Sequence, residues 1–197
     1  MAIIDDDLER LRRCVELARV ALDEGDEPFG SILVDGDGAT LYEDRNRVKD
    51  GDHTRHPEFA IARWAVDNLT PDERARATVY TSGEHCPMCA AGHAWVGLGR
   101  IVYAASSAQL SEWLTEWGSR PPPVAPLPVP TVAPHVVVDG PAPELADAMK
   151  ALYDAFKIQR ETGPLSVPKE LGASAELQAV ALADAKFKRQ QADFLGI

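Results

Sequence analysis

Cysteine and histidine occur in two short motifs that could hold a metal ion. Cys86-Pro87-Met88-Cys89 contains two of the three cysteines of the 197-residue chain. Residues three apart lie on one face of a helix, so both sulfurs would point the same way at a helix start. Pro87 suits the first helical position, where its missing N–H costs nothing. The positive end of the helix favours both thiolates, which are good ligands for zinc.

His56-Pro57-Glu58 has the same order, a potential ligand followed by a proline that can begin a helix. Two helix N-termini of this kind can aim His56, Cys86 and Cys89 at one point. Three protein ligands leave the fourth position of a zinc tetrahedron open for water, which is typical of a catalytic site. Glu58 is placed to accept the proton of that water. We therefore predict a Zn²⁺ site of His56, Cys86 and Cys89, with Glu58 as the catalytic base.

Two other interpretations of these motifs remain open from the residues alone. His53 and His56 form an H-x-x-H pair, which with Cys86 and Cys89 would make a closed, four-ligand structural zinc site. That arrangement leaves Glu58 without a role. Alternatively, the two cysteines could form a redox pair, but the order of elements does not match the thioredoxin fold.

The apolar pattern places these motifs in a chain of alternating helices and strands. Helices are predicted over 8–22, 57–69, 86–97, 110–117 and 145–156. Strands are predicted over 31–34, 40–42, 77–81, 100–104 and 136–138, and the first two are joined by a hairpin turn at 35–38. Strands separated by helices predict an α/β domain, with a sheet of about five strands and helices on both faces.

The proline content rises sharply after the fourth predicted helix. Residues 121–134 contain seven prolines and are predicted to be extended and irregular. We interpret 119–134 as a stiff connection inside a single domain over 1–160, because the chain beyond it is too short for a separate core. Residues 161–197 are predicted to be a C-terminal helical extension, with a helix over 173–194. The extension would pack on the domain or at an oligomer interface.

Charge and composition limit the class of partner. The formal net charge is −11, and nucleic acids are bound through Lys and Arg, so a small-molecule substrate is favoured over a nucleic acid. The apolar runs are too short to cross a membrane, and Asp5-Asp6-Asp7 is the opposite of a basic leader. An odd number of cysteines argues against a disulfide framework and favours a reducing, cytoplasmic setting.

The two motifs together resemble the H-x-E…P-C-x-x-C signature of the zinc-dependent cytidine deaminase superfamily. The resemblance extends over about residues 5–117 and is strongest to the branch of guanine, cytosine and tRNA-adenosine deaminases. Residues 28–34 (PFGSILV) are similar to the first strand of that branch.

The same resemblance implies three candidate substrate-binding residues. Asn46 resembles the asparagine with which the branch binds the base. Trp95 stands where guanine deaminases of the branch also carry a tryptophan. Phe29 is the third candidate, although a residue that begins a strand is favoured as part of the core.

The resemblance also implies a fold, an activity and an assembly. It implies a three-layer α/β/α sandwich, hydrolytic release of ammonia from an aminated nitrogen heterocycle, and a dimer or tetramer, of which we expect a homodimer. A guanine-like purine is the first substrate hypothesis, because of Trp95 and the acidic chain, and cytosine or cytidine is the second. The alternatives are a tRNA adenosine deaminase and a catalytically inactive, zinc-stabilised binding module. The module is considered because His85 replaces a signature proline and Pro57 stands where most relatives have alanine.

Overall fold

The computed structural model describes residues 3–119 and 122–162, which all belong to one compact unit, Met1–Gly163. The predicted helix over 173–194 lies outside the described residues. No helix in these two described ranges is both long enough and apolar enough to cross a bilayer.

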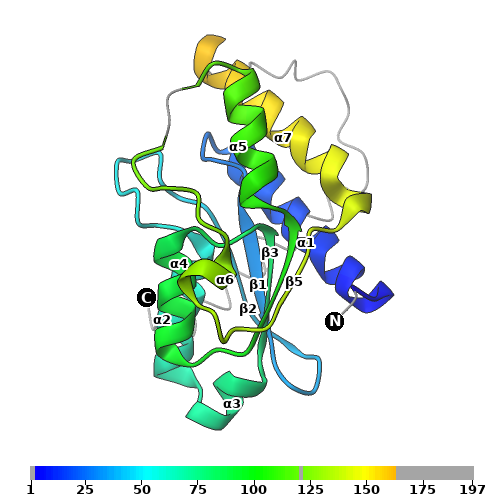
Figure 1. The fold of residues 1–197 in the computed structure, drawn as a ribbon, viewed down its shortest axis with the longest axis vertical. Coiled ribbons are helices and arrows are strands. Elements are labelled where there is room, and N and C mark those ends of the chain that lie inside the picture. Colours follow the sequence, from blue (N-terminus) through cyan, green and yellow to red (C-terminus); the bar gives the residue numbers. More distant parts are fainter. Residues whose placement is uncertain (1–2, 120–121, 163–197) are drawn as a thin grey trace. The chain divides into compact units, whose positions relative to one another are not determined.

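Five strands form one mixed sheet, in the order β2-β1-β3-β4-β5 (Figure 1). They are β1 (Gly30–Val34), β2 (Thr40–Arg45), β3 (Thr78–Gly83), β4 (Arg100–Ala105) and β5 (Val138–Asp139). β1 is antiparallel to β2 and to β3, whereas β3, β4 and β5 are parallel. The parallel strands are connected by helices, because a parallel pair needs a long crossover. The predicted sheet of about five strands is confirmed.

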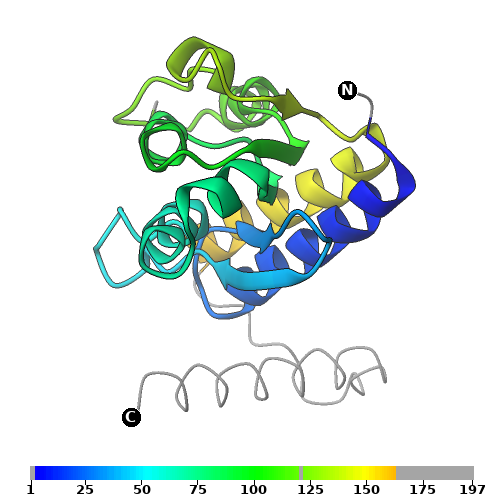
Figure 2. The same cartoon turned by 90° about the horizontal axis from the view of Figure 1, so that it is seen from below.

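Helices cover both faces of the sheet, which confirms the three-layer α/β/α sandwich (Figure 2). One face packs against α1 (Asp5–Asp23), α5 (Ser107–Glu116) and α7 (Pro143–Thr162). The other packs against α2 (Pro57–Asn68) and α4 (Pro87–Val96), and α4 also contacts the short α6 (Val129–Val132). α3 (Pro71–Arg76) connects α2 to β3.

Side chains alternate between the two faces along each strand, as the pleat requires. In β3, Tyr80 packs into the core on the α1 and α7 face, whereas Val79 packs into the core under α2. In β1, Ile32 packs on the α1 and α7 face, whereas Leu33 packs under α2. This alternation also turns Thr81 toward α2, where its hydroxyl meets a residue of that helix.

Two short helices were not predicted from the sequence. The sequence suggested only a helix end at Thr70-Pro71, yet Thr70 begins α3: its Oγ1 accepts the Glu73 N–H at 3.4 Å, and Glu73 Oε2 accepts the Thr70 N–H at 2.7 Å. The expectation of irregular chain over 121–134 is wrong for α6, a single turn. That turn is held by its Val129 N–H, which donates to Glu84 Oε1 at 2.9 Å.

Candidate active site

His56 and Cys86 occupy the N-cap positions of α2 and α4, as the sequence predicts. Both have extended backbone, with φ/ψ of −84°/140° for His56 and −66°/165° for Cys86, and a proline follows each. Each proline has a φ that suits the first helical position, and the N–H that it lacks would have no partner within the helix there. α4 ends at Gly97, whose φ of +74° is easily adopted only by a residue without Cβ. Two separate helix starts therefore present their cap side chains to a common point.

Three ligand atoms meet at this point with the spacing of a zinc tetrahedron. The Cys86 and Cys89 sulfurs are 3.5 Å apart, and His56 Nδ1 lies 3.7 Å from Cys86 Sγ and 3.6 Å from Cys89 Sγ. Zn–S bonds of about 2.3 Å and Zn–N bonds of about 2.0 Å at tetrahedral angles place sulfurs about 3.8 Å apart and N and S about 3.5 Å apart. The donor set, two thiolates and one imidazole, is also one that zinc prefers. The residues therefore fit a zinc ion.

Glu58 lies directly beside this cluster. It is in the first turn of α2 and only 4% exposed. Its Oε2 is 3.7 Å from Cys89 Sγ, and its Oε1 accepts a hydrogen bond from Thr81 Oγ1 at 2.9 Å. One carboxylate oxygen thus faces the cluster while the other is held by the sheet.

The four groups at this point alter one another's protonation. Burial works to lower the pKa of His56, but its contact with Cys86 and the charge of Glu58 outweigh burial and raise that pKa to about 9. The Cys89 thiol, together with His56, lowers the pKa of the Cys86 thiol to about 4 against the effect of burial. Contact with Cys86, followed by burial, raises the pKa of Cys89 well above its usual range, and burial raises the pKa of Glu58. A dication among these groups would favour both thiolates at once.

A closed four-ligand zinc site is contradicted by the position of His53. Among the described residues, the cluster that could hold a metal consists of His56, Cys86 and Cys89 alone. His53 lies in the turn before α2 and is exposed. The metal cluster and Glu58 also leave no support for a redox pair, since His56 and Glu58 would then be unexplained.

Asn46 is the only one of the three proposed base-binding residues with a free buried group. It is fully buried at the end of β2, and its Oδ1 accepts the Val48 N–H at 3.1 Å. Its Nδ2 has no hydrogen-bond partner within the described part of the chain. The neighbouring Arg47 N–H donates to Arg55 O at 3.1 Å, which brings this loop beside His56.

The other two residues lie in different surroundings. Phe29 is half-buried and makes an edge contact with Tyr153 of α7, at a ring-centroid distance of 5.6 Å, so it packs on the core. Trp95 is 89% exposed, the most exposed large apolar side chain described. Among the residues that the structure describes, none encloses the Trp95 indole in a pocket.

Two buried histidines, His85 and His93, lie next to each other. Each is 1% exposed, and their rings meet edge-on with centroids 5.4 Å apart. Burial lowers the pKa of both, that of His93 to about 4, so the two rings are neutral near pH 7. A buried imidazole therefore stands directly before Cys86, where the signature has a proline.

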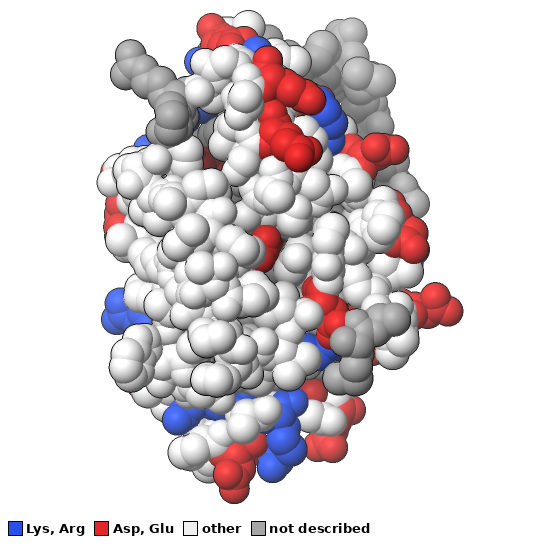
Figure 3. All heavy atoms as spheres, viewed as in Figure 1, with Lys and Arg blue, Asp and Glu red and all other residues white. Residues whose placement is uncertain are grey.

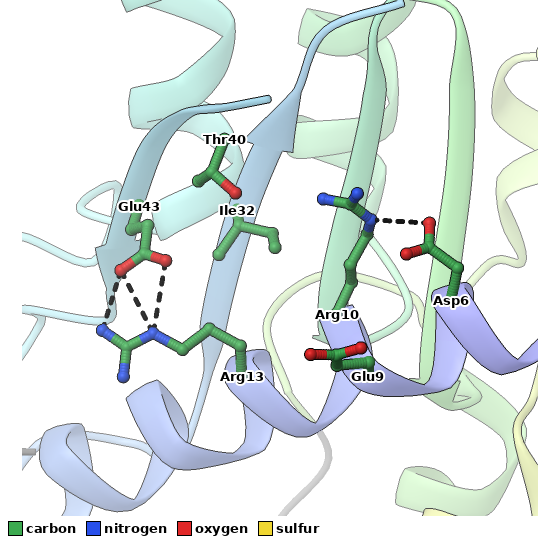
Figure 4. Close-up of a pocket in the computed structure, with 7 residues that line it drawn as sticks. All are labelled: Asp6, Glu9, Arg10, Arg13, Ile32, Thr40 and Glu43. Carbon is green, nitrogen blue, oxygen red and sulfur yellow. Dashed lines mark hydrogen bonds and ion pairs between the residues drawn. The ribbon is translucent and has the colours of Figure 1, made fainter. Parts of the chain in front are cut away.

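A surface pocket between α1 and the β1–β2 hairpin is a separate feature (Figure 4). It is lined by Asp6, Glu9, Arg10, Arg13, Ile32, Thr40 and Glu43. Arg13 pairs with Glu43 at 2.8 Å and Arg10 with Asp6 at 3.0 Å, so its cations are already neutralised. Ile32 faces α1, whereas the metal cluster lies on the α2 face of the sheet. The pocket is therefore no part of the candidate active site.

Residues 4–105 match the family model of the cytidine and deoxycytidylate deaminase zinc-binding region. The matched range contains His56, Cys86, Cys89 and Glu58. The chain belongs to this family. It is a zinc-dependent deaminase, and His56, Cys86 and Cys89 are positioned to bind the metal that the family description names.

Three relatives named for different substrates show similar identity to this chain. A probable cytosine deaminase of Schizosaccharomyces pombe is 36% identical over 118 residues, which is 59% of this chain and 70% of the relative. A guanine deaminase of Bacillus subtilis is 35% identical over 104 residues, 52% of this chain and 66% of that protein. A tRNA-specific adenosine deaminase of Agrobacterium fabrum is 34% identical over 89 residues, 45% of this chain and 58% of that protein.

The fold similarity extends beyond the family region. The solved guanine deaminase of Nitrosomonas europaea superposes with a TM-score of 0.60, covering 80% of this chain and 87% of that chain. At 21% identity, this likeness concerns the fold alone.

Proposed function

We propose that this deaminase hydrolyses a free aminated nucleobase, with Glu58 as its catalytic base and acid, and releases ammonia. The observation that carries the proposal is the buried Glu58 carboxylate, whose Oε2 lies 3.7 Å from Cys89 Sγ beside the three-ligand cluster. A structural zinc site has no use for a carboxylate in that position. The catalytically inactive module is therefore disfavoured.

The chain's own residues divide the work of the reaction. His56, Cys86 and Cys89 would hold the zinc ion. When bound, the ion would lower the pKa of the water molecule that attacks the substrate. Glu58 takes a proton from the water and delivers it to the ring nitrogen next to the carbon that carries the amine. Glu58 then transfers a second proton to the departing amine, so that water and substrate yield the keto product and ammonia. Backbone N–H groups in the first turn of α4 stabilise negative charge on the attacking oxygen.

Asn46 is proposed to bind the base. Its Nδ2 is a buried donor without a partner among the described residues, and a buried donor left unsatisfied costs about 1–3 kcal/mol. A carbonyl oxygen on the substrate ring would satisfy it. Both cytosine and guanine carry such an oxygen, so this contact fits either base.

The acidic charge of the chain bears on the size of its substrate. A net charge of −11 disfavours binding to a phosphate backbone, so we propose a free base over tRNA and no nucleic-acid partner. The expectation of guanine relied in part on Trp95 as a pocket wall, and the exposed indole gives it no support. The cytosine deaminase relative is covered more fully than the others. We therefore propose cytosine and guanine as the two bases to test first.

The exposed Trp95 suggests a dimer interface and not a wall of the substrate pocket. Its exposure of 89% is costly for an indole in water, and the surface seen over α4 and α6 is largely uncharged (Figure 3). We propose that the chain is a homodimer in which Trp95 is covered by the second copy.

We also propose that the chain has a single deaminase domain over 1–160 with a C-terminal extension over 161–197.

The deciding experiment measures ammonia release from purified, zinc-loaded protein. The panel contains cytosine, guanine, adenine, cytidine, adenosine and guanosine, with a tRNA arm read as inosine formation. Turnover of a free base, absent in Glu58→Gln, is the expected result. Turnover of tRNA alone would contradict the free-base proposal and identify a tRNA adenosine deaminase instead. Stoichiometric zinc without turnover of any substrate would support the inactive binding module.

A further inference from the structure

Glu58 is the last member of a chain of three hydrogen-bonded side chains. Ser31 Oγ lies 2.9 Å from Thr81 Oγ1, and Thr81 Oγ1 lies 2.9 Å from Glu58 Oε1. Ser31 and Thr81 are 0% exposed, and Glu58 is 4% exposed. No motif in the sequence identified either hydroxyl.

The direction of the chain follows from the donors available. An ionised carboxylate can only accept, so the single proton of Thr81 is directed to Glu58 Oε1. Thr81 must then accept from its other neighbour, and Ser31 donates to it. Each hydroxyl therefore has a defined proton position, and successive bonds of this kind strengthen one another.

The sheet fixes both hydroxyls. Ser31 and Thr81 are direct partners in the antiparallel pairing of β1 with β3, and both side chains point to the α2 face. Cross-strand pairs of this type hold their side chains a few ångströms apart without any contribution from a loop. Glu58 projects from the first turn of α2 toward the sheet and accepts the hydrogen bond of Thr81. The carboxylate is thus anchored to two paired interior strands of the sheet.

We propose that Thr81 is a positioning residue for Glu58 and that Ser31 acts through Thr81. By binding Oε1, Thr81 fixes the rotation of the carboxylate and leaves Oε2, the oxygen 3.7 Å from Cys89 Sγ, free for proton transfer. This inference rests on the proposed role of Glu58. It adds that the carboxylate is held ready by the sheet before substrate binds.

The first test is kinetic and uses the base that the panel identifies. Thr81→Val removes the donor with little change of shape, and we expect kcat to fall about 10- to 100-fold with KM within about twofold. Thr81→Ser keeps the hydroxyl and should restore most of kcat. Ser31→Ala should have a smaller effect, and the double variant should be no slower than Thr81→Val alone.

Thr78→Val is the matched control, because it makes the same substitution on the same strand. Its kcat should stay within about twofold of the unaltered enzyme. The proposal is overturned if Thr81→Val keeps full kcat, or if Thr81→Ser is as slow as Thr81→Val. Zinc content is measured throughout and should remain one ion per chain.

A second readout separates this inference from the proposed function. In crystal structures of the zinc-loaded proteins, Glu58 Oε1 should remain within hydrogen-bonding distance of Thr81 in the unaltered chain. In Thr81→Val, the carboxylate should rotate or shift away. An unmoved carboxylate in Thr81→Val would refute the positioning role even if the enzyme proved active. A shifted carboxylate in a protein inactive on every substrate would refute the function and keep the positioning role.

Discussion

Glu58 Oε2 lies 3.7 Å from the sulfur of Cys89, while the other carboxylate oxygen is bound by Thr81. The carboxylate therefore adjoins the ligand cluster without belonging to its three-atom set. Metal binding and proton transfer should be separable by mutation at this residue.

Glu58→Gln should retain one zinc ion per chain and lose activity by about 100- to 10,000-fold, the range expected for removal of a general acid and base. Glutamine keeps the shape and can still accept from Thr81, so the fold should be unchanged. Metal analysis and ammonia release measure the two effects on the same sample. Loss of zinc in this variant would show instead that Glu58 is needed to hold the metal.

Substitution of a metal-binding residue should have the opposite effect from Glu58→Gln, because the zinc ion itself should be lost. Cys86→Ser should lose zinc and the stability that zinc contributes, because a ligand that binds only the folded state stabilises it. The midpoint of thermal unfolding of the unaltered chain should fall on addition of a chelator, and that of Cys86→Ser should not respond. His53→Ala is the control: an exposed residue outside the cluster, it should leave metal content and the chelator response unchanged.

The metal site could be predicted because its signals are local. Cys86-Pro87 and His56-Pro57 each specify a helix start, and the residue types at those starts specify a metal. Convergence of the two starts follows from packing both helices on one face of one sheet. The resemblance to a known family rests on the same two motifs and leads to the same site.

The supporting residues could not be predicted in this way. Ser31 and Thr81 are ordinary strand residues until the register of β1 with β3 sets them side by side. The contact of Thr81 with Glu58 also depends on how α2 packs on the sheet. The start of α3 is different, since Thr70 and Glu73 have the spacing of a capping box that was visible in the sequence.

A buried ion-pair network ties the start of α1 to the sheet and should govern stability in acid. Arg100 donates to both carboxylate oxygens of Asp7 at 2.8 and 3.0 Å, and to Asp139 at 2.7 Å, while Tyr80 donates to Asp7 at 2.8 Å. Burial works to raise the pKa of Asp7, but the bonds from Arg100 and Tyr80 outweigh it and lower the pKa below its ordinary value.

Asp7→Asn should therefore lower the free energy of unfolding at pH 7 by about 3 kcal/mol, because it leaves a partly buried guanidinium with one partner fewer. A lowered folded-state pKa contributes stability above the unfolded pKa of about 3.9, and that stability is lost as the pH falls through the folded value. The difference between Asp7→Asn and the unaltered chain should shrink below about pH 4. Denaturant unfolding across this range measures it, and a constant difference would rule out the network as its source.

Glu84 should couple the proline-rich segment to the loop that carries Cys86. Its Oε1 accepts the Val129 N–H and its Oε2 accepts the Ser107 N–H, both at 2.9 Å. Glu84→Ala leaves two N–H groups without this acceptor and should cost about 2 kcal/mol in denaturant unfolding. Glu116→Ala, an exposed carboxylate in α5, should change stability by less than about 0.5 kcal/mol. Equal effects of the two substitutions would show that the two hydrogen bonds accepted by Glu84 contribute nothing to stability.

Trp95 should contribute to association and not to the stability of the single chain. Its side chain is 89% exposed, so Trp95→Ser removes little packing within the chain. If a second copy covers the indole, the dimer dissociation constant should rise at least about 30-fold, since a buried interface tryptophan contributes about 2 kcal/mol or more. Sedimentation velocity over a concentration series measures this shift. Ile158→Ser is the matched control, an exposed apolar residue on α7 across the sheet that should leave association unchanged. An unaltered chain that stays monomeric, or a Trp95→Ser dimer of full strength, would exclude this surface as the interface.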